Sequence, residues 1–174
     1  MKSLRYTLLT AGVCLGMLLW FMSCSFHTRY CESAQVPTPG WMLQDTLFFP
    51  VSVADSASVA NQITAHTPYT LNLGIRHTNE FPYQMLCLQF AVEYLDENGS
   101  PVATLITQDI LAPLTNDEGK WNGRSWGSFY EKELTVSPLT LSFPNAGNYR
   151  IRLLPRPGQA PLPGLESLTL SIPE

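Results

Sequence analysis

The sequence predicts an all-β protein, an antiparallel β-sandwich of about seven to eight strands, either immunoglobulin-like or jelly-roll-like. Three observations lead to this prediction. Apolar and polar residues alternate with a period of two almost everywhere after Trp41, which is the pattern of half-buried strands. Turn residues separate the alternating segments, and no helical period lasts longer than one turn.

The first predicted strands span residues 47–53, 69–76 and 86–94. Each alternates apolar side chains with polar or small ones, so one face of each strand is expected to be buried. Pro50 lies inside the first of them. Because proline cannot donate a backbone hydrogen bond to a ladder, we expect that strand at a sheet edge or at a bulge.

The remaining predicted strands span residues 102–112, 128–136, 147–154 and 167–172. The run Asp96–Gly99 predicts the hairpin turn before the first of these, since the central Asn and Gly both tolerate a positive φ. The proline-rich segment 155–163 is expected to be a loop leading to the last strand, not a linker to a second domain.

The first 23 residues have the three parts of a secretory signal peptide. Lys2 and Arg5 form a positive start, an apolar stretch runs from Leu8 to Met22, and a small residue stands beside a cysteine. The apolar stretch is shorter than the roughly 20 residues of a spanning helix, so a permanent transmembrane anchor is the less favoured interpretation.

The pair Ser23-Cys24 resembles the bacterial lipobox, in which a small residue precedes a cysteine that receives diacylglycerol before cleavage. Phe21 stands where that motif usually has leucine. The sequence predicts lipidation of Cys24 and stable anchoring by its acyl chains, with ordinary cleavage and a free thiol as the alternative. We therefore expect three parts: a lipoprotein signal peptide over 1–23, a lipidated tether over 24–40 and a β-sandwich domain over 41–174.

Two further cysteines, Cys31 and Cys87, would enter an oxidising compartment that permits a disulfide between them. Cys31 lies in the predicted tether, and Cys87 lies within a predicted strand, where a buried free thiol is common. A disulfide and two free thiols are both open alternatives from the sequence.

Charge and residue spacing exclude several classes of function. Removing Lys2 and Arg5 with the signal leaves eight of the ten basic residues against fourteen acidic ones, a formal charge of −6. The basic residues are scattered, so nucleic acid is not expected as a partner. No metal-ligand spacing, nucleophile motif or phosphate loop occurs in the sequence, and we expect no metal, no cofactor and no enzymatic activity.

Two clusters are candidates for binding. Residues 118–128 hold basic and aromatic residues between glycines, which suits a loop that presents them to a partner or a glycan; the alternative is a lid with buried tryptophans. The second cluster ends a predicted strand and precedes the rigid corner Phe81-Pro82-Tyr83. Together the clusters give six candidate partner-binding residues: Arg76, His77, Lys120, Trp121, Arg124 and Trp126.

The ordered set of motifs resembles the gliding-motility-associated lipoprotein family GldH. After the lipoprotein start at Cys24, the motifs cover the chain from Gly40 to Ile172. They are Gly40-Trp41 with Phe49 soon after, Tyr69-x-Leu71-x-Leu73-x-Ile75-Arg76-His77, Phe81-Pro82-Tyr83, Asn98-Gly99, Asp117-Glu118-Gly119-Lys120-Trp121-Asn122-Gly123 and Phe143-x-x-Ala146-Gly147-x-Tyr149. The chain departs from the family pattern at Gln84-Met85-Leu86 and in the proline-rich segment 156–164.

The resemblance implies an outer-membrane lipoprotein tied to the gliding machinery and its associated secretion system, with no catalytic residue to carry over. Ser25 follows the cysteine where Asp would resemble an inner-membrane retention signal, which favours the outer membrane. No acidic run of the kind found in some surface-exported lipoproteins follows Cys24, which favours the periplasmic face. We expect a non-enzymatic scaffold or assembly component that binds other envelope proteins. The alternative is a glycan- or peptide-binding module that uses the Trp121–Trp126 loop.

Overall fold

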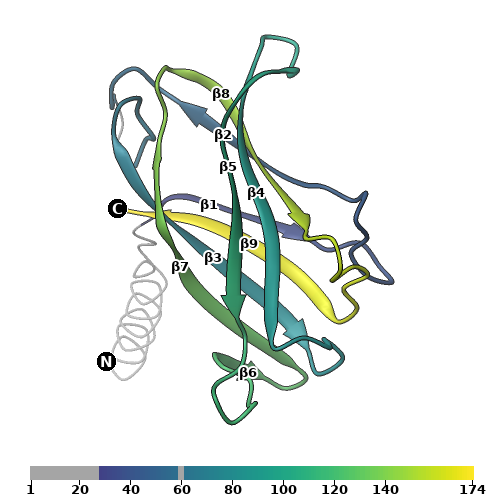
Figure 1. Ribbon diagram of the computed structural model, residues 1–174. Helices are drawn as coiled ribbons and strands as arrows, with labels where there is room; N and C mark the ends of the chain where they lie inside the picture. Colours follow the sequence, from purple (N-terminus) through teal and green to yellow (C-terminus); the bar gives the residue numbers. More distant parts are fainter. Residues whose placement is uncertain (1–27, 59–60) are drawn as a thin grey trace, which may run out of the picture.

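The computed structural model describes residues 28–58 and 61–174, which form two packed β-sheets (Figure 1). Nine strands occur in this described part of the chain: β1 (Thr28–Gln35), β2 (Leu47–Val53), β3 (Pro68–Thr78), β4 (Met85–Leu95), β5 (Pro101–Pro113), β6 (Arg124–Trp126), β7 (Phe129–Ser142), β8 (Gly147–Pro155) and β9 (Leu165–Pro173).

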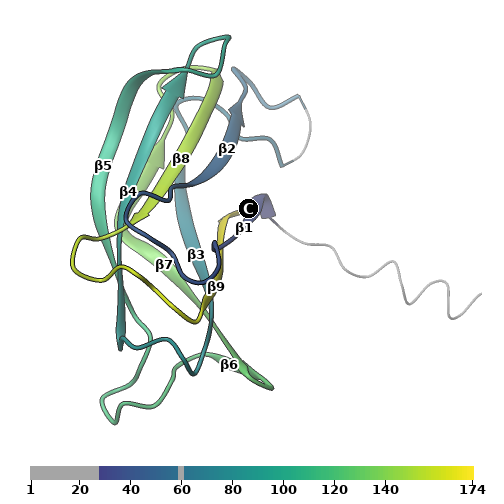
Figure 2. The ribbon, with the colours of Figure 1, turned by 90° about the vertical axis from the view of Figure 1, so that its right-hand side faces the viewer.

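The strands pair as a jelly roll. One sheet has the order β1-β9-β3-β7-β6 and the other the order β2-β8-β4-β5, and all pairs are antiparallel. With the short β6 set aside, β1 pairs with β9, β2 with β8, β3 with β7 and β4 with β5, which is the wrapping of a jelly roll. The two layers are visible edge-on in Figure 2. The predicted antiparallel sandwich is confirmed, in its jelly-roll form.

The core lies between the sheets, where their inner faces meet. Buried residues alternate with exposed or half-buried ones along β2, β3 and β8, as the period of two predicts. Large side chains that are fully buried there contribute about 1.5–3 kcal/mol each. The six largest are Trp41, Tyr149, Phe49, Phe81, Phe90 and Phe143.

Each of the seven predicted strands has a counterpart in the structure. β2 has the predicted bounds and lies at the edge of its sheet, as Pro50 predicts. β7 is longer than predicted and continues past Val136 to Ser142.

The folded part of the chain begins earlier than the sequence predicts. Within the predicted tether 24–40, the residues of β1 pair with β9 from Thr28 opposite Pro173 to Gln35 opposite Ser167. The five-stranded sheet therefore includes Thr28–Gln35, residues that the sequence assigns to the tether. The alternation is weak in β1 because the strand has a neighbour on one side only and none of its residues is fully buried.

The hairpin between β4 and β5 turns at the predicted residues but with a different geometry. Gly99 has a φ of 77°, whereas Asn98 does not have a positive φ. Asp96 accepts a hydrogen bond from the N–H of Gly99 and donates its own N–H to Ser100. The turn is therefore a three-residue loop that ends in a left-handed glycine, instead of a two-residue Asn-Gly turn.

Candidate functional site

The two predicted clusters meet at one end of the five-stranded sheet, where β7 lies between β3 and β6. The pleat of β3 places Arg76 on the outer face of the sheet and His77 on the inner face. His77 is fully buried, whereas the side chain of Arg76 is partly exposed. These two chain neighbours therefore belong to different environments.

His77 lies among aromatic rings in what we term the His77 cluster, formed by His77, Phe81, Trp121 and Tyr130. The centroid of its ring lies 4.6 Å from that of Trp121, and 5.6 Å from those of Tyr130 and Phe81. The indole N–H of Trp121 donates to Asn79 Oδ1 at 3.0 Å. Trp121 thus closes this end of the sandwich, which corresponds to the lid alternative for its loop.

The surroundings of His77 favour its neutral form. Nδ1 lies 3.0 Å from the carbonyl oxygen of Thr78 and donates to it in the neutral tautomer, while the buried Nε2 has no hydrogen-bond partner. Burial lowers the pKa of His77 because the imidazolium would lose its hydration, and the hydrogen bond to Thr78 offsets part of that effect. The imidazole contacts aromatic rings and a backbone carbonyl group. In a hydrolytic site, a catalytic histidine would instead contact a nucleophile and a carboxylate.

Lys120 lies at the exposed end of the loop that carries Trp121. The side chain of Asn116 accepts hydrogen bonds from the backbone N–H groups of Glu118 and Lys120, which tightens the loop into a turn. Lys120 Nζ lies 2.8 Å from Glu118 Oε2, and both side chains are at least 70% exposed. Ion pairs with this exposure contribute little to stability, so Lys120 is a solvated residue.

The other three candidates gather on the outer face of the sheet. Arg76, Arg124, Trp126, Phe129 and Glu131 form what we term the tip patch. Glu131 of β7 lies between Arg76 of β3 and Arg124 of β6, and Phe129 lies opposite Trp126. Residues that pair directly across strands share a face of the sheet. The tip patch is thus a contiguous surface at one end of the sandwich.

Contacts within the tip patch hold Arg76 against Glu131 and Phe129. Arg76 Nε lies 3.5 Å from Glu131 Oε1, and the guanidinium carbon of Arg76 lies 4.4 Å from the centroid of the Phe129 ring. The second distance is typical of a cation–π interaction. Trp126 stands beside this group with 60% of its surface exposed.

Sequence reasoning did not find β6, Phe129 or Glu131, although a signal for the hairpin is present. Gly127, with a φ of 62°, opens the two-residue turn between Trp126 and Phe129. A glycine at the first turn position is the requirement of a type II′ hairpin. The pair Gly127-Ser128 between two aromatic residues is therefore a hairpin signal inside the predicted loop.

The outer face of the four-stranded sheet carries a charged cluster that the sequence analysis also did not find. The buried carboxylate of Glu93 lies 2.6 Å from Arg150 Nε and 3.3 Å from Arg152 Nε. The guanidinium carbon of Arg150 also lies 4.6 Å from the centroid of the exposed Phe48 ring. Both arginines serve to neutralise the buried Glu93, which would be costly if it were unpaired.

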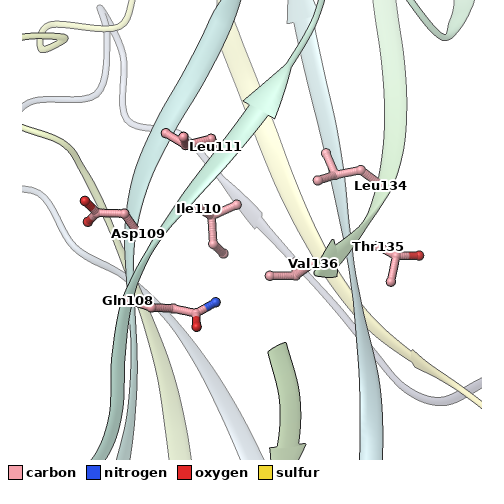
Figure 3. Close-up of a pocket in the computed structure, with 7 residues that line it drawn as sticks. All are labelled: Gln108, Asp109, Ile110, Leu111, Leu134, Thr135 and Val136. Atoms are coloured by element: carbon pink, nitrogen blue, oxygen red, sulfur yellow. The ribbon is translucent and has the colours of Figure 1, made fainter. Parts of the chain in front are cut away.

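A pocket of about 200 Å³ lies between β5 and β7, at the side where the two sheets are open (Figure 3). Asp109, Leu111 and Thr135 point away from it. Four side chains point toward one another across the gap: Gln108 and Ile110 from β5, and Leu134 and Val136 from β7. The pocket is therefore a gap in the packing between two strand edges, with three apolar side chains and one amide side chain directed inward.

The remaining predictions concern the cysteines, metal binding and a membrane-spanning helix. The predicted lipidation site, Cys24, lies outside the described residues. Cys31 of β1 and Cys87 of β4 are free thiols in the structure and are not joined by a disulfide. Across residues 28–58 and 61–174, no group of three or more His, Cys, Asp or Glu side chains could hold a metal ion. The same residues contain no helix long and apolar enough to span a membrane.

Residues 28–172 match the protein family described as GldH lipoprotein. Among curated proteins, none is similar enough to count as a relative. The family match therefore provides the comparison by sequence, and it spans all nine strands of the described structure with the exception of the last residue of β9.

Solved structures provide a comparison by fold. The chain is 13% identical to the uncharacterized protein lmo2446 from Listeria monocytogenes EGD-e, and the match covers 83% of this chain and 11% of that one with a TM-score of 0.39. It is also 13% identical to an exo-β-1,3-galactanase from Phanerochaete chrysosporium, over 80% of this chain and 26% of the enzyme, with a TM-score of 0.33. A family 35 carbohydrate binding module from Clostridium thermocellum is 14% identical over 80% of this chain and 97% of the module, with a TM-score of 0.30. At these identities the likeness concerns the fold alone, and this chain spans only a small part of the first two proteins.

Proposed function

Because the chain belongs to the GldH lipoprotein family, we propose that it is a non-enzymatic, gliding-motility-associated lipoprotein that docks another envelope protein as a scaffold or assembly component. The observation that carries the docking proposal is the tip patch. It presents one exposed tryptophan, Trp126, together with Arg124 on a short, tightly turned hairpin, and Arg76 on the adjacent strand β3.

The composition of the tip patch suits protein binding. Tryptophan and arginine are the residues most enriched among those that dominate the energy of protein interfaces. Phe129 and Glu131 contact Arg76 on one side, so its guanidinium group is already oriented before a partner arrives. Orientation before binding reduces the entropy lost on association.

The tip patch also lies far from the expected anchor. Cys31, near the start of β1, pairs with Ser171 of β9, which in turn pairs with Asn72 of β3. Trp126 pairs with Phe129 of β7, which in turn pairs with Thr78 of β3. Six residues along β3 correspond to roughly 20 Å. With Cys24 held at a membrane, the tip patch would point away from that membrane, toward partners that extend beyond the membrane surface.

The side chains that could do chemistry favour a non-enzymatic role. His77 is enclosed by rings, and Glu93 is neutralised by two arginines. We propose the outer membrane as the location because Ser25 follows Cys24, and the periplasmic side because no acidic run follows that cysteine.

Co-purification after crosslinking tests this function. We expect the tagged full chain to retain envelope proteins, and Trp126→Ala to reduce recovery of a specific partner roughly tenfold, the effect of losing one dominant interface residue. Phe48→Ala is the matched control, because Phe48 is a similarly exposed aromatic residue beside an arginine on the other sheet. Both variants should keep the melting temperature of the wild type. Equal recovery with Trp126→Ala, or no partner after crosslinking, would contradict the proposal.

Trp126 also favours the second candidate, glycan binding, because an exposed indole offers a flat face for a sugar ring. Trp121 does not support this candidate, since its ring packs on His77 and its N–H is occupied by Asn79. Retention on a carbohydrate array that is lost in Trp126→Ala but kept in Phe48→Ala would assign the tip patch to a glycan instead of a protein.

A further inference from the structure

We propose that the open side of the sandwich binds an extended peptide segment of a partner protein, which pairs with β5 as an additional strand and places an apolar side chain in the pocket between β5 and β7. This inference rests on the proposed function for the existence of a protein partner. It concerns a different surface from the tip patch.

Three of the four outermost strands are protected against pairing with another chain. β2 has Pro50 at its centre, and β6 has only three residues. β1 has an irregularity after Thr28, and its Glu32 pairs with Leu170 on the inner face of the sheet. Prolines, short length, irregular pairing and inward-facing charges are the usual means by which proteins block strand addition.

β5 is the exception among these four strands, because half of it has none of these protective features. The part of β7 beyond Glu131, where its pairing with β6 ends, also lacks a strand neighbour on that side, but it contains Lys132 and Pro138.

The irregularities in the pairing of β5 with β4 lie opposite Val92–Glu93 and Tyr94–Leu95, and the two prolines of β5 are its first and last residues. Residues 106–112, which follow these irregularities and precede the last proline, pair regularly with β4 on one side and have no strand neighbour on the other. We term this segment the open edge. It contains neither proline nor lysine, and its one charged residue, Asp109, pairs with Arg156 at 3.3 Å.

The unpaired backbone of the open edge defines what kind of ligand fits. A free strand edge presents a row of N–H and C=O groups, and only another extended chain can pair with that row at regular spacing. Side chains of an added strand alternate between the two faces of the sheet. Every second side chain would therefore point toward the interior of the sandwich.

The pocket lies where such a side chain would point. Gln108 and Ile110 of the open edge turn inward toward Leu134 and Val136 of β7, leaving a volume of about 200 Å³ between them (Figure 3). This volume is enough for one apolar side chain. On the outer face, Leu111 is 53% exposed and could pack against the alternate side chains of the added strand.

A second copy of this chain suits the open edge less well than a different protein. Asp109 is the central residue of segment 106–112, so symmetric antiparallel pairing of two copies would place Asp109 opposite Asp109. The formal charge of −6 after removal of Lys2 and Arg5 adds a long-range repulsion between copies.

Hydrogen–deuterium exchange on the full chain in detergent tests the proposal. The probe is a synthetic peptide of about nine residues that alternates valine and threonine, the length of one strand. We expect the peptide to slow exchange at residues 106–112 about tenfold and to leave β2 unchanged, because a bound strand must leave before those amides open. The same peptide with a central proline should have no effect.

A pair of variants tests the role of the pocket. Gln108→Trp fills the gap between β5 and β7 and should abolish most of the protection, whereas Gln89→Trp makes the same change on the outer face of β4 and should keep it. Absence of protection by the alternating peptide, or equal protection by the proline peptide, would overturn the proposal even if Gln108→Trp failed to fold. Protection that rises with protein concentration alone, together with a dimer mass, would instead assign the open edge to a second copy. Co-purification through the tip patch is independent of these outcomes, so the two proposals can fail separately.

Discussion

Arg76 and His77 are neighbours in the chain, but the pleat of β3 sends one to solvent and the other into the core. Burial favours the neutral imidazole of His77, whose ring packs against the other three rings of the His77 cluster. Its Nδ1 faces the Thr78 carbonyl, and its Nε2 faces the rings around it without a hydrogen-bond partner. A proton at Nε2 would bring an unpaired charge into that cluster, which links the stability of this end of the sandwich to pH.

We predict that the protein loses stability as the pH falls below about 6.5, the ordinary pKa of histidine in an unfolded chain. Burial lowers the pKa of His77 in the fold, so the unfolded chain binds the proton more readily. The contribution of His77 is therefore complete above that pH and decreases as the pH falls toward the folded pKa. Thermal unfolding between pH 7.5 and 5 measures the effect.

His77→Asn should remove this part of the pH dependence, because an amide can still donate to the Thr78 carbonyl but does not titrate. His66→Asn is the matched control. His66 is exposed with a φ of 60°, a conformation that asparagine tolerates well. Identical pH profiles for the wild type and His77→Asn would contradict the assignment.

The hairpin of β6 and β7 builds the tip patch from very few residues, and two glycines make it possible. Gly123, with a φ of 102°, precedes β6, and a Cβ atom there would lie 2.1 Å from the carbonyl oxygen of Glu131. Gly127, with a φ of 62°, has open space around the corresponding position. Both need a left-handed backbone, but only Gly123 also needs the absence of a side chain.

We predict that Gly123→Ala lowers the free energy of unfolding by at least roughly 1–3 kcal/mol, because the clash with Glu131 forces β6 away from β7. Gly127→Ala should cost only about 1 kcal/mol, the penalty of a left-handed conformation. Urea titration of both variants measures the difference. Equal losses would mean that β6 adapts to the added methyl group and that the tip patch is less rigid than its contacts indicate.

The strands that sequence patterning predicts are those with one buried and one open face. β2 shows this pattern over its whole length, with Leu47, Phe49, Val51 and Val53 buried. β1 and β6 lie at sheet edges with much of both faces exposed, so their residues carry no period of two. These strands are held by pairing with β9 and β7, which depends on register and not on the local sequence.

The sequence singles out three of the five residues of the tip patch, Arg76, Arg124 and Trp126, but not Phe129 or Glu131 and not how the five are grouped. Alternation along β3 is enough to place Arg76 and His77 on opposite faces. The contact of His77 with Trp121 joins residues far apart in the chain and depends on how a loop folds over the end of the sandwich. The glycine signals for the hairpin were present at Gly123 and Gly127, but the close approach of Glu131 to Gly123 appears only in three dimensions.

At the scale of the whole molecule, the jelly roll separates three surfaces. The start of β1 lies at one end of the five-stranded sheet, the tip patch lies at the other, and the open edge of β5 lies along the side between the sheets. Anchoring at Cys24 would hold the first end at a membrane. The other two surfaces would then be available to partners at the same time.

The last prediction concerns the lipid anchor at Cys24. We expect a labelled fatty acid to be incorporated into the wild type and into Cys31→Ser, but not into Cys24→Ser, which should also leave the membrane fraction. Cys31→Ser is the matched control because Cys31 is an exposed free thiol that already lies within a paired strand, opposite Ser171. Two or three acyl chains bind a membrane stably, so the lipidated forms should be released by detergent and not by high salt. Equal labelling of all three proteins would show that Cys24 is not the lipidated residue, and the orientation of the tip patch away from the membrane would lose its basis.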